Sequence, residues 1–295
     1  MQTQRVTGRG LLAVNLAVVL FGLAGVLGQL TGLPAVLVTL GRALCGALAL
    51  FVFARACRTT LSVARPALIR LIGQGVLLAV HWTIFFHAIA VAGVAIGLLS
   101  FATFPLFTAL LEPLLLGTRV SRPQLLAACC MAMGVYVLVP EFSLDSAAVQ
   151  GILWGLVAAA SFALLAVLNR RLGRTTSSLV LSLYQNGVAA LVLLPVLLVA
   201  PLDRLLEPRV LLLLFILGVG CTAVAHTLFL AGLQLMTAQL ASLLVGLEPV
   251  WAIVLGVLLL GEWPTARSVA GGAIIVAATI LPTALAYHQR EQPPA

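Results

Sequence analysis

Six long stretches without a charged side chain decide what this chain can fold into. They run over residues 10–41, 71–111, 146–169, 175–202, 210–247 and 268–289. The hydrocarbon core of a bilayer is about 30 Å thick and takes about 20 helical residues to cross. Each stretch is therefore long enough to span a membrane, and 71–111 and 210–247 are long enough to span it twice.

Composition excludes the soluble classes of protein. The chain is 62% hydrophobic and only 8% charged, whereas a soluble domain carries about 25% charged residues. A soluble enzyme, a nucleic-acid-binding domain and a disordered protein are therefore excluded. All 16 basic residues are arginines, and most of them stand at the ends of apolar runs rather than in a patch that would bind nucleic acid.

The pattern predicts an all-α polytopic membrane protein with ten transmembrane helices. Strands are not expected, because the apolar runs are continuous rather than alternating. Turn residues at Thr31–Pro34 and a glycine at Gly93 mark breaks within the long runs. We expect helices at about 9–29, 34–54, 67–89, 93–117, 122–140, 149–169, 177–199, 210–232, 237–260 and 267–287.

The arginines predict the orientation of these helices, because cytoplasmic loops carry an excess of positive charge. With a cytoplasmic N-terminus, the outer segments hold only Arg204, Arg209 and Arg267. The cytoplasmic segments then hold Arg5, Arg9, Arg55, Arg58, Arg65, Arg70, Arg119, Arg122, Arg170, Arg171, Arg174 and Arg290. We therefore expect both termini in the cytoplasm.

The sequence also repeats itself. A shift of 144 residues places Pro105 on Pro249 and Gly117 on Gly261, and in both halves the glycine is the twelfth residue after the proline. We expect a first repeat over residues 1–145, with helices 1 to 5, and a second over 146–295, with helices 6 to 10. Because five is an odd number, the second repeat enters the membrane inverted. Inverted repeats are typical of alternating-access transporters, whose substrates bind near the membrane midplane.

Two segments carry a resemblance to a known family. They are PLFTALLEPLLLGTRVSRPQ in the first half and LEPVWAIVLGVLLLGEWPTARSVAGGAIIVAA in the second. With the five-plus-five arrangement, the chain resembles the paired EamA repeats of the drug/metabolite transporter superfamily, and it looks most similar to YddG-type amino-acid exporters of bacterial inner membranes. The first half departs from the pattern, because Thr118 stands where the pattern has glutamate.

The resemblance implies how the helices are arranged. The third and fourth helices of each half would form hairpins beside a central cavity, and the fifth helices would pack at the back. The first, third and fourth helices of each half would line the pathway, while the second helices would lie towards the outside.

Aromatic and histidine residues form the first candidate binding site. His81 and Phe85 share a helix face with spacing i, i+4. The shift of 144 places Trp82 opposite His226 and Phe85 opposite Phe229. An imidazole hydrogen-bonds a carboxylate and a ring face attracts an ammonium group, so these residues would suit a zwitterion. The alternative is that the same side chains only pack between helices.

Other polar residues at membrane depth extend this substrate-binding set, because such groups are costly in a bilayer. Each has an alternative role in helix packing or at the membrane interface. The further candidates are Asn15, Ser100, Trp154, Ser161, Gln239 and Ser242.

Two acidic residues beside prolines are candidates for gating or coupling. Glu248 lies deep in a predicted helix before Pro249, where it either binds protons or an ammonium group or is a structural group. Glu112 lies near a cytoplasmic helix end, where pairing with Arg119 or Arg122 would close an inner gate. Pro105 and Pro249 are the matching bends. For Arg42, on a helix expected to be peripheral, a structural role is favoured.

These features favour an inner-membrane carrier that exports amino acids, above all neutral and aromatic ones. The alternative is a multidrug or other small-metabolite exporter of the same superfamily. A cation carrier would need an acid in the first helix, and residues 10–30 contain none. An enzyme is not expected, because no metal-spaced histidines, Ser-His-Asp pattern or phosphate loop occurs. We expect no cofactor or metal and a working monomer in the bilayer, with proton coupling left open.

Overall fold

The computed structural model describes residues 8–117, 122–138, 143, 145–200, 202–236 and 238–291. Within these ranges, the side chains of 122–125, 128, 239, 242, 243 and 279–291 lie outside the description. The described residues form helices joined by turns, without strands. This agrees with the all-α prediction.

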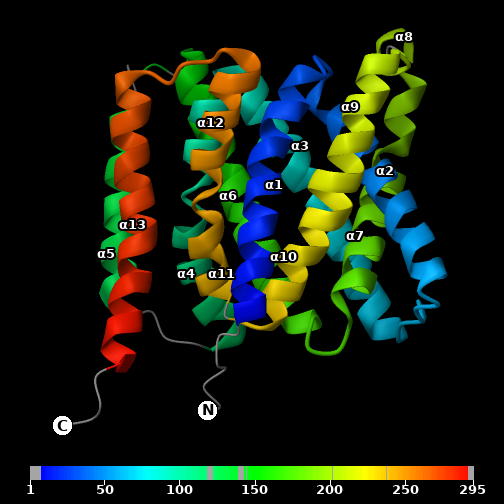
Figure 1. Cartoon of the computed structure of the whole chain (residues 1–295), viewed down its shortest axis with the longest axis horizontal. Helices are drawn as coiled ribbons and strands as arrows, with labels where there is room; N and C mark the ends of the chain where they lie inside the picture. The colour runs from blue at the N-terminus through cyan, green and yellow to red at the C-terminus, as the bar shows by residue number, and fades with distance from the viewer. Residues whose placement is uncertain are drawn as a thin grey trace.

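The first half crosses the molecule back and forth (Figure 1). Its helices are α1 (Gly8–Leu30), α2 (Ala35–Ala56), α3 (Arg65–Phe101), α4 (Phe104–Leu116) and α5 (Arg122–Leu138). Within α3 the backbone leaves helical geometry at Gly93, where φ is 80° and ψ is 168°. Only glycine adopts this conformation readily, and the chain reverses there as the sequence predicts.

The second half repeats this path in the opposite sense (Figure 1). Its elements are α6 (Ala147–Leu172), α7 (Ser178–Leu193), η1 (Leu194–Leu198), α8 (Leu202–Leu205), α9 (Pro208–Gly218), η2 (Val219–Val224), α10 (Ala225–Gln234), α11 (Ala238–Val245), α12 (Glu248–Leu260) and α13 (Ala266–Glu291). The π-helical turn η2 joins α9 to α10 as one continuous rod. The helix α1 begins and α13 ends at the same end of the molecule.

The fourth crossing of each half is a broken helix, which the sequence analysis did not predict. Single helices at 93–117 and 237–260 are wrong, because turns at 102–103 and 246–247 interrupt them. Pro105 and Pro249 take the first turns of α4 and α12, where their missing N–H costs no hydrogen bond. Both helices then end at a left-handed glycine, Gly117 with φ 70° and Gly261 with φ 69°.

The two halves pack on each other reciprocally. The helix α1 packs against α10 and α12, and its counterpart α6 packs against α3 and α4. The remaining pairs join counterparts directly, α2 with α7 and α5 with α13. Figure 1 shows α5 and α13 side by side at one edge of the molecule. Every crossing of the first half therefore has a partner in the second half.

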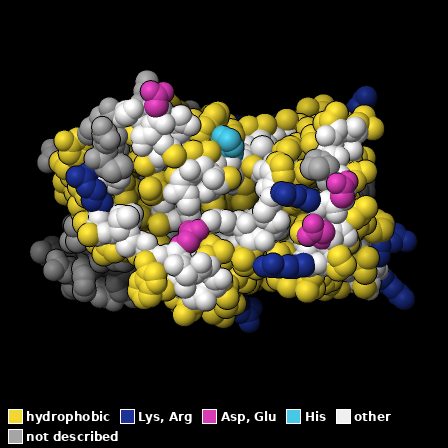
Figure 2. Space-filling model, turned by 90° about the horizontal axis from the view of Figure 1, so that it is seen from above, with side chains coloured by type: hydrophobic (Ala, Val, Ile, Leu, Met, Phe, Trp, Pro, Cys, Tyr) yellow, Lys and Arg dark blue, Asp and Glu magenta, His cyan; other side chains and the backbone are white. Residues whose placement is uncertain are grey.

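Much of the outer surface is apolar. Among the described residues, the helical segments long and apolar enough to cross a membrane are Gly8–Leu30, Ala35–Ala56, Arg65–Phe101, Ala147–Leu172, Ser178–Leu198 and Pro208–Gln234. Large apolar side chains such as Leu48, Phe53 and Leu258 are exposed, as lipid-facing residues would be. Figure 2 shows one end of the molecule, where charged side chains are few and scattered.

Gly151 and Gly232 allow two close approaches between helices of opposite halves. A Cβ at Gly151 would lie 2.2 Å from the Cβ of Ala92, and one at Gly232 would lie 2.4 Å from a methyl carbon of Val14. Both glycines stand between helices of opposite halves. A side chain at either position would force the halves apart.

We expect Gly232→Leu to lower the apparent melting temperature of the detergent-purified protein, because overpacking a close contact costs about 1–3 kcal/mol. The control is Gly73→Leu, since a Cβ at Gly73 meets nothing within 4 Å. The apparent melting temperatures of both variants are measured by heating samples and monitoring the loss of the folded peak by size-exclusion chromatography. Equal losses in the two variants would contradict this account of the interface.

Candidate functional site

A cavity lies in the middle of the molecule, between the two halves. Six helices line it: α1, α2, α3, α6, α10 and α12. The lining residues are Phe21, Ala24, Arg42, Leu78, His81, Trp82, Phe85, Phe101, Phe162, His226 and Glu248. The cavity therefore combines one basic, one acidic and two imidazole side chains with an aromatic wall.

Arg42 is the basic group of the cavity, although the sequence analysis placed its helix at the periphery. Its side chain is 2% exposed. Its Nε donates to Thr222 Oγ1 at 2.9 Å and its Nη2 to the carbonyl of Cys221 at 3.2 Å. Its guanidinium carbon lies 4.0 Å from the centre of the Trp82 ring. The structural role predicted for Arg42 is present, but α2 also delivers this cation to the cavity wall.

Glu248 is the acidic group of the cavity and the first residue of α12. The side chain is 3% exposed, and no residue of the described chain forms a hydrogen bond or ion pair with its carboxyl group. No salt bridge joins Glu248 to Arg42, so the carboxyl oxygens of Glu248 lie more than 4.0 Å from the guanidinium nitrogens of Arg42. The positive end of a helix dipole favours a carboxylate at this position.

The two histidines reach the cavity from opposite halves. His81 on α3 packs against Phe162 and Phe101, with ring centres 5.2 and 5.7 Å away. His226 on α10 meets the edge of Trp82 at 5.8 Å. The predicted approach of His81, Trp82 and His226 is therefore present in the structure.

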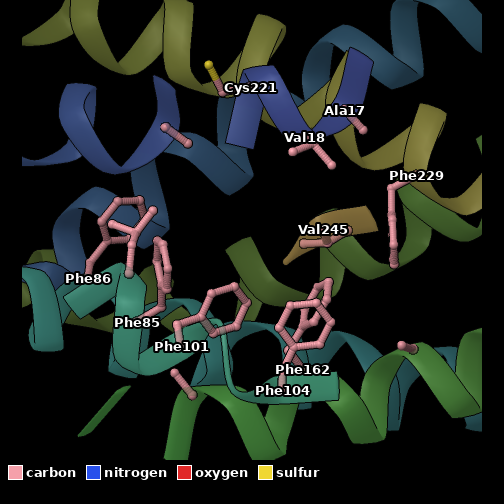
Figure 3. Close-up of a cluster of buried hydrophobic side chains, with 14 of the residues drawn as sticks. Ala17, Val18, Phe85, Phe86, Phe101, Phe104, Phe162, Cys221, Phe229 and Val245 are labelled. Carbon is pink, nitrogen blue, oxygen red and sulfur yellow. The ribbon is translucent and has the colours of Figure 1, made fainter. Parts of the chain in front are cut away.

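Phenylalanine rings form one wall of the cavity (Figure 3). Phe85 meets Phe101 edge to face at 5.1 Å, and Phe101 in turn meets Phe162 at 5.4 Å. Phe229 lies behind this wall, where it packs against Phe162 at 5.4 Å and Phe21 at 6.0 Å. Sequence reasoning missed Phe21, Phe101 and Phe162, because nothing in an apolar run distinguishes a cavity-facing phenylalanine from a buried one.

Several other predicted site residues lie away from the cavity. Asn15 is exposed and donates to the carbonyl of Leu11 in its own helix. Trp154 is 41% exposed and packs against His87. Ser100 is buried and hydrogen-bonded within its own helix.

Ser161 lies behind the cavity, 3.0 Å from Nδ1 of His81. The side chains of Gln239 and Ser242 fall outside the described residues.

Polar contacts join the helices at both ends of the molecule. At one end Glu112 forms an ion pair of 3.3 Å with Arg170, whose Nε also donates to the carbonyl of Met236. The predicted partners Arg119 and Arg122 lie outside the described side chains. At the other end the Gln29 amide donates to Glu262. The contacts of Glu112 with Arg170 and of Gln29 with Glu262 each link the two halves across the bundle.

We expect the ion pair of Glu112 with Arg170 to contribute a measurable coupling free energy. Residues in one ion-pair network couple by about 0.5–3 kcal/mol. Glu112→Gln combined with Arg170→Gln should lower the melting temperature less than the two single losses added together. Arg171→Gln is the control, because Arg171 is exposed. Additive losses for the first pair would contradict the coupling.

Comparison with known proteins gives a consistent result over most of the chain. A model of the EamA-like transporter family matches residues 8–139 and 149–283. Among curated proteins, an uncharacterized transporter of Archaeoglobus fulgidus is 28% identical over 91% of this chain and 94% of its own. The uncharacterized transporter YwfM of Bacillus subtilis is 27% identical over 73% of each chain.

A third relative is the protein PecM of Dickeya dadantii, which is 28% identical over 71% of each chain. A solved crystal structure superposes with a TM-score of 0.73 over 96% of this chain and 99% of its own, at 22% identity. This likeness and the family match confirm the predicted all-α polytopic membrane fold.

Proposed function

We propose, from the premise that the chain belongs to the EamA-like transporter family, that it exports amino acids, with neutral and aromatic ones favoured. Family membership makes the chain a multi-pass membrane transporter of a small molecule rather than an enzyme. The substrate class and the likeness to YddG-type exporters are proposals.

One observation carries the substrate class: a buried basic side chain and a buried acidic side chain face the same cavity without forming an ion pair. Arg42 and Glu248 are both at least 95% buried. Unpaired charges in a low-dielectric interior cost several kcal/mol each. A zwitterion that places its carboxylate at Arg42 and its ammonium group at Glu248 would compensate both charges at once, whereas a singly charged ligand would compensate only one.

The aromatic wall supports a preference for bulky side chains. Phe85, Phe101 and Phe162 offer ring faces and edges at one side of the cavity. Aromatic pairs contribute about 0.5–1.5 kcal/mol beyond the burial of area. We therefore assign substrate contact to His81, Trp82, Phe85 and His226 together with Arg42 and Glu248. Asn15 and Trp154 are left out, because their side chains lie on the outer surface.

The reciprocal packing of the halves supports alternating access. In this proposal residues 1–145 and 146–295 are the two inverted repeats, and they exchange conformations around the cavity. The turns before Pro105 and Pro249 would serve as hinges, and the ion pair of Glu112 with Arg170 would close one end.

The arginines support an orientation and a location. Arg55, Arg65 and Arg170 lie at the end of the molecule where α1 begins and α13 ends. With that end in the cytoplasm, the chain follows the positive-inside rule. We propose a bacterial inner-membrane protein with both termini in the cytoplasm. We propose that a monomer suffices, since helices of both halves of one chain line the cavity.

A multidrug or organic-cation carrier is the second candidate. The unpaired carboxyl group of Glu248 and the ring faces beside it favour a cation. The guanidinium of Arg42 in the same cavity opposes it by like-charge repulsion.

Charge analogues of one amino acid separate these candidates. In proteoliposomes preloaded with L-phenylalanine, we expect exchange of labelled L-phenylalanine, with no competition from phenethylamine or 3-phenylpropionate, which each lack one charge. Arg42→Gln and Glu248→Gln should each lower exchange at least tenfold, because a charge-assisted hydrogen bond contributes about 1.5–3 kcal/mol. Trp154→Phe is the control. Exchange of phenethylamine alone would overturn the amino-acid proposal.

We expect Phe85→Leu to reduce the preference for L-phenylalanine over L-leucine. The change keeps an apolar side chain but removes the ring, so the preference should fall roughly two- to tenfold. Counterflow rates of the two labelled amino acids measure it. The control is Phe53→Leu, because Phe53 is 58% exposed. An unchanged ratio in Phe85→Leu would mean that this ring does not contact the substrate.

A further inference from the structure

Asn186 fixes which nitrogen of His226 carries the proton. Asn186 is fully buried on α7, and its Nδ2 lies 2.8 Å from the carbonyl oxygen of Ser182. Because that carbonyl can only accept, the amide must present its NH₂ group there. The same NH₂ group lies 3.3 Å from Nδ1 of His226 and donates to it. Nδ1 of His226 is therefore unprotonated, and Nε2 carries the hydrogen.

The surroundings of His81 fix the opposite arrangement. Its Nδ1 lies 3.1 Å from the carbonyl oxygen of Ala158, which only accepts, so Nδ1 carries the hydrogen. Ser161 Oγ lies 3.0 Å from the same nitrogen, and its own hydroxyl donates to that carbonyl at 2.8 Å. The serine oxygen therefore accepts from His81. Nε2 of His81 is left with a lone pair.

Both imidazoles are neutral in this arrangement. His81 is 3% and His226 is 5% exposed, and both line the cavity that holds the Arg42 guanidinium. A buried imidazolium beside that cation would carry an uncompensated charge. For neither ring does a described residue hydrogen-bond Nε2, so this nitrogen remains for a ligand.

His226 and Arg42 share two neighbours, Thr222 and Trp82. The Nε of Arg42 donates to the hydroxyl of Thr222. Thr222 lies one helical turn before His226 on the continuous α9–η2–α10 helix. The Trp82 ring contacts both the guanidinium and the His226 imidazole. Arg42 and His226 are thus donors on the α2 and α10 walls, whereas the lone pair of His81 on α3 and the carboxyl group of Glu248 on α12 are acceptors.

We infer that Asn186 is a positioning residue that holds His226 as a hydrogen-bond donor to the substrate carboxylate beside Arg42, while Ala158 and Ser161 hold His81 as an acceptor for the ammonium group. The assignment of substrate groups rests on the proposed function. The two tautomers do not, because protein atoms alone fix them.

Nitrogen NMR of the imidazoles tests the tautomers without any substrate. The chain has four histidines, and His87→Gln with His288→Gln leaves only the two in the cavity. In ¹⁵N-histidine-labelled protein, we expect a proton on Nε2 of His226 and on Nδ1 of His81. Asn186→Leu should change the His226 signals and leave those of His81 in place. A proton on Nδ1 of His226 in the otherwise unchanged protein would overturn the inference.

Exchange of labelled L-phenylalanine tests the consequence for binding. Asn186→Leu should raise KM about tenfold with a smaller change in kcat, and His226→Gln should retain binding, because a glutamine amide still offers an N–H donor. His226→Met should lose binding. The control is His87→Met, since His87 lies on the exterior against Trp154. Equal KM values for Asn186→Leu and the unchanged protein would overturn the positioning role.

The two measurements separate the two proposals. If the unchanged protein carries no amino acid while the tautomers are as expected, the proposed substrate is wrong and the donor and acceptor assignment stands. If L-phenylalanine is carried but both histidines hold the proton on the same nitrogen, the inference is wrong and the proposed function stands.

Discussion

A guanidinium inside an apolar bundle is the constraint on which the centre of this protein depends. Arg42 is almost fully buried, so the protein must supply most of its hydrogen-bond partners. The π-helical turn η2 offers the hydroxyl of Thr222 and the carbonyl of Cys221, and Trp82 covers the cation from α3. One charge on α2 thereby fixes how α3 and the α9–η2–α10 rod approach each other, and it leaves part of the guanidinium facing the cavity.

The break in the fourth crossing of the second half shapes the same cavity, because it determines where Glu248 lies in its helix. A continuous helix from Ala238 to Leu260 would bury Glu248 in mid-helix, whereas the turn at 246–247 makes it the first residue of α12. The positive end of the α12 dipole favours a carboxylate there, although no salt bridge joins it to Arg42. The carboxyl group is therefore buried without a hydrogen-bond partner among the described residues, and a ligand can provide one.

Hydrophobic patterning predicts the crossings because membrane thickness sets helix length and the uncharged runs match it. The repeat spacing from Pro105 to Gly117 predicts the matching ends of α4 and α12 for the same local reason, since proline and left-handed glycine act on their own backbone. The breaks at 102–103 and 246–247 were missed, because proline was read as a bend within a helix rather than as a start.

The cavity was predicted only where polarity was visible in the sequence. His81, Trp82 and His226 stood out from their apolar surroundings, whereas Phe101 and Phe162 did not. Arg42 was visible but was assigned to a peripheral helix, because the depth of α2 depends on tertiary packing. The same limit applies to Asn15, whose exposed position follows from the rotation of α1 about its axis.

The pairing of α2 with α7 places an uncharged residue where symmetry would repeat the arginine. A Cβ at Gly218 would lie 3.0 Å from the carbonyl of Arg42, and one at Gly75 would lie 3.1 Å from the carbonyl of Gln185, so these two residues occupy corresponding positions. Gln185 bonds to amide groups of Gln74 and Asn169 instead of facing a cation. In the proposed alternating access the halves exchange shapes, but the charge stays with one of them. The inward-facing and outward-facing forms of that mechanism would then not be equivalent by symmetry, and side chains rather than the backbone would set their relative populations.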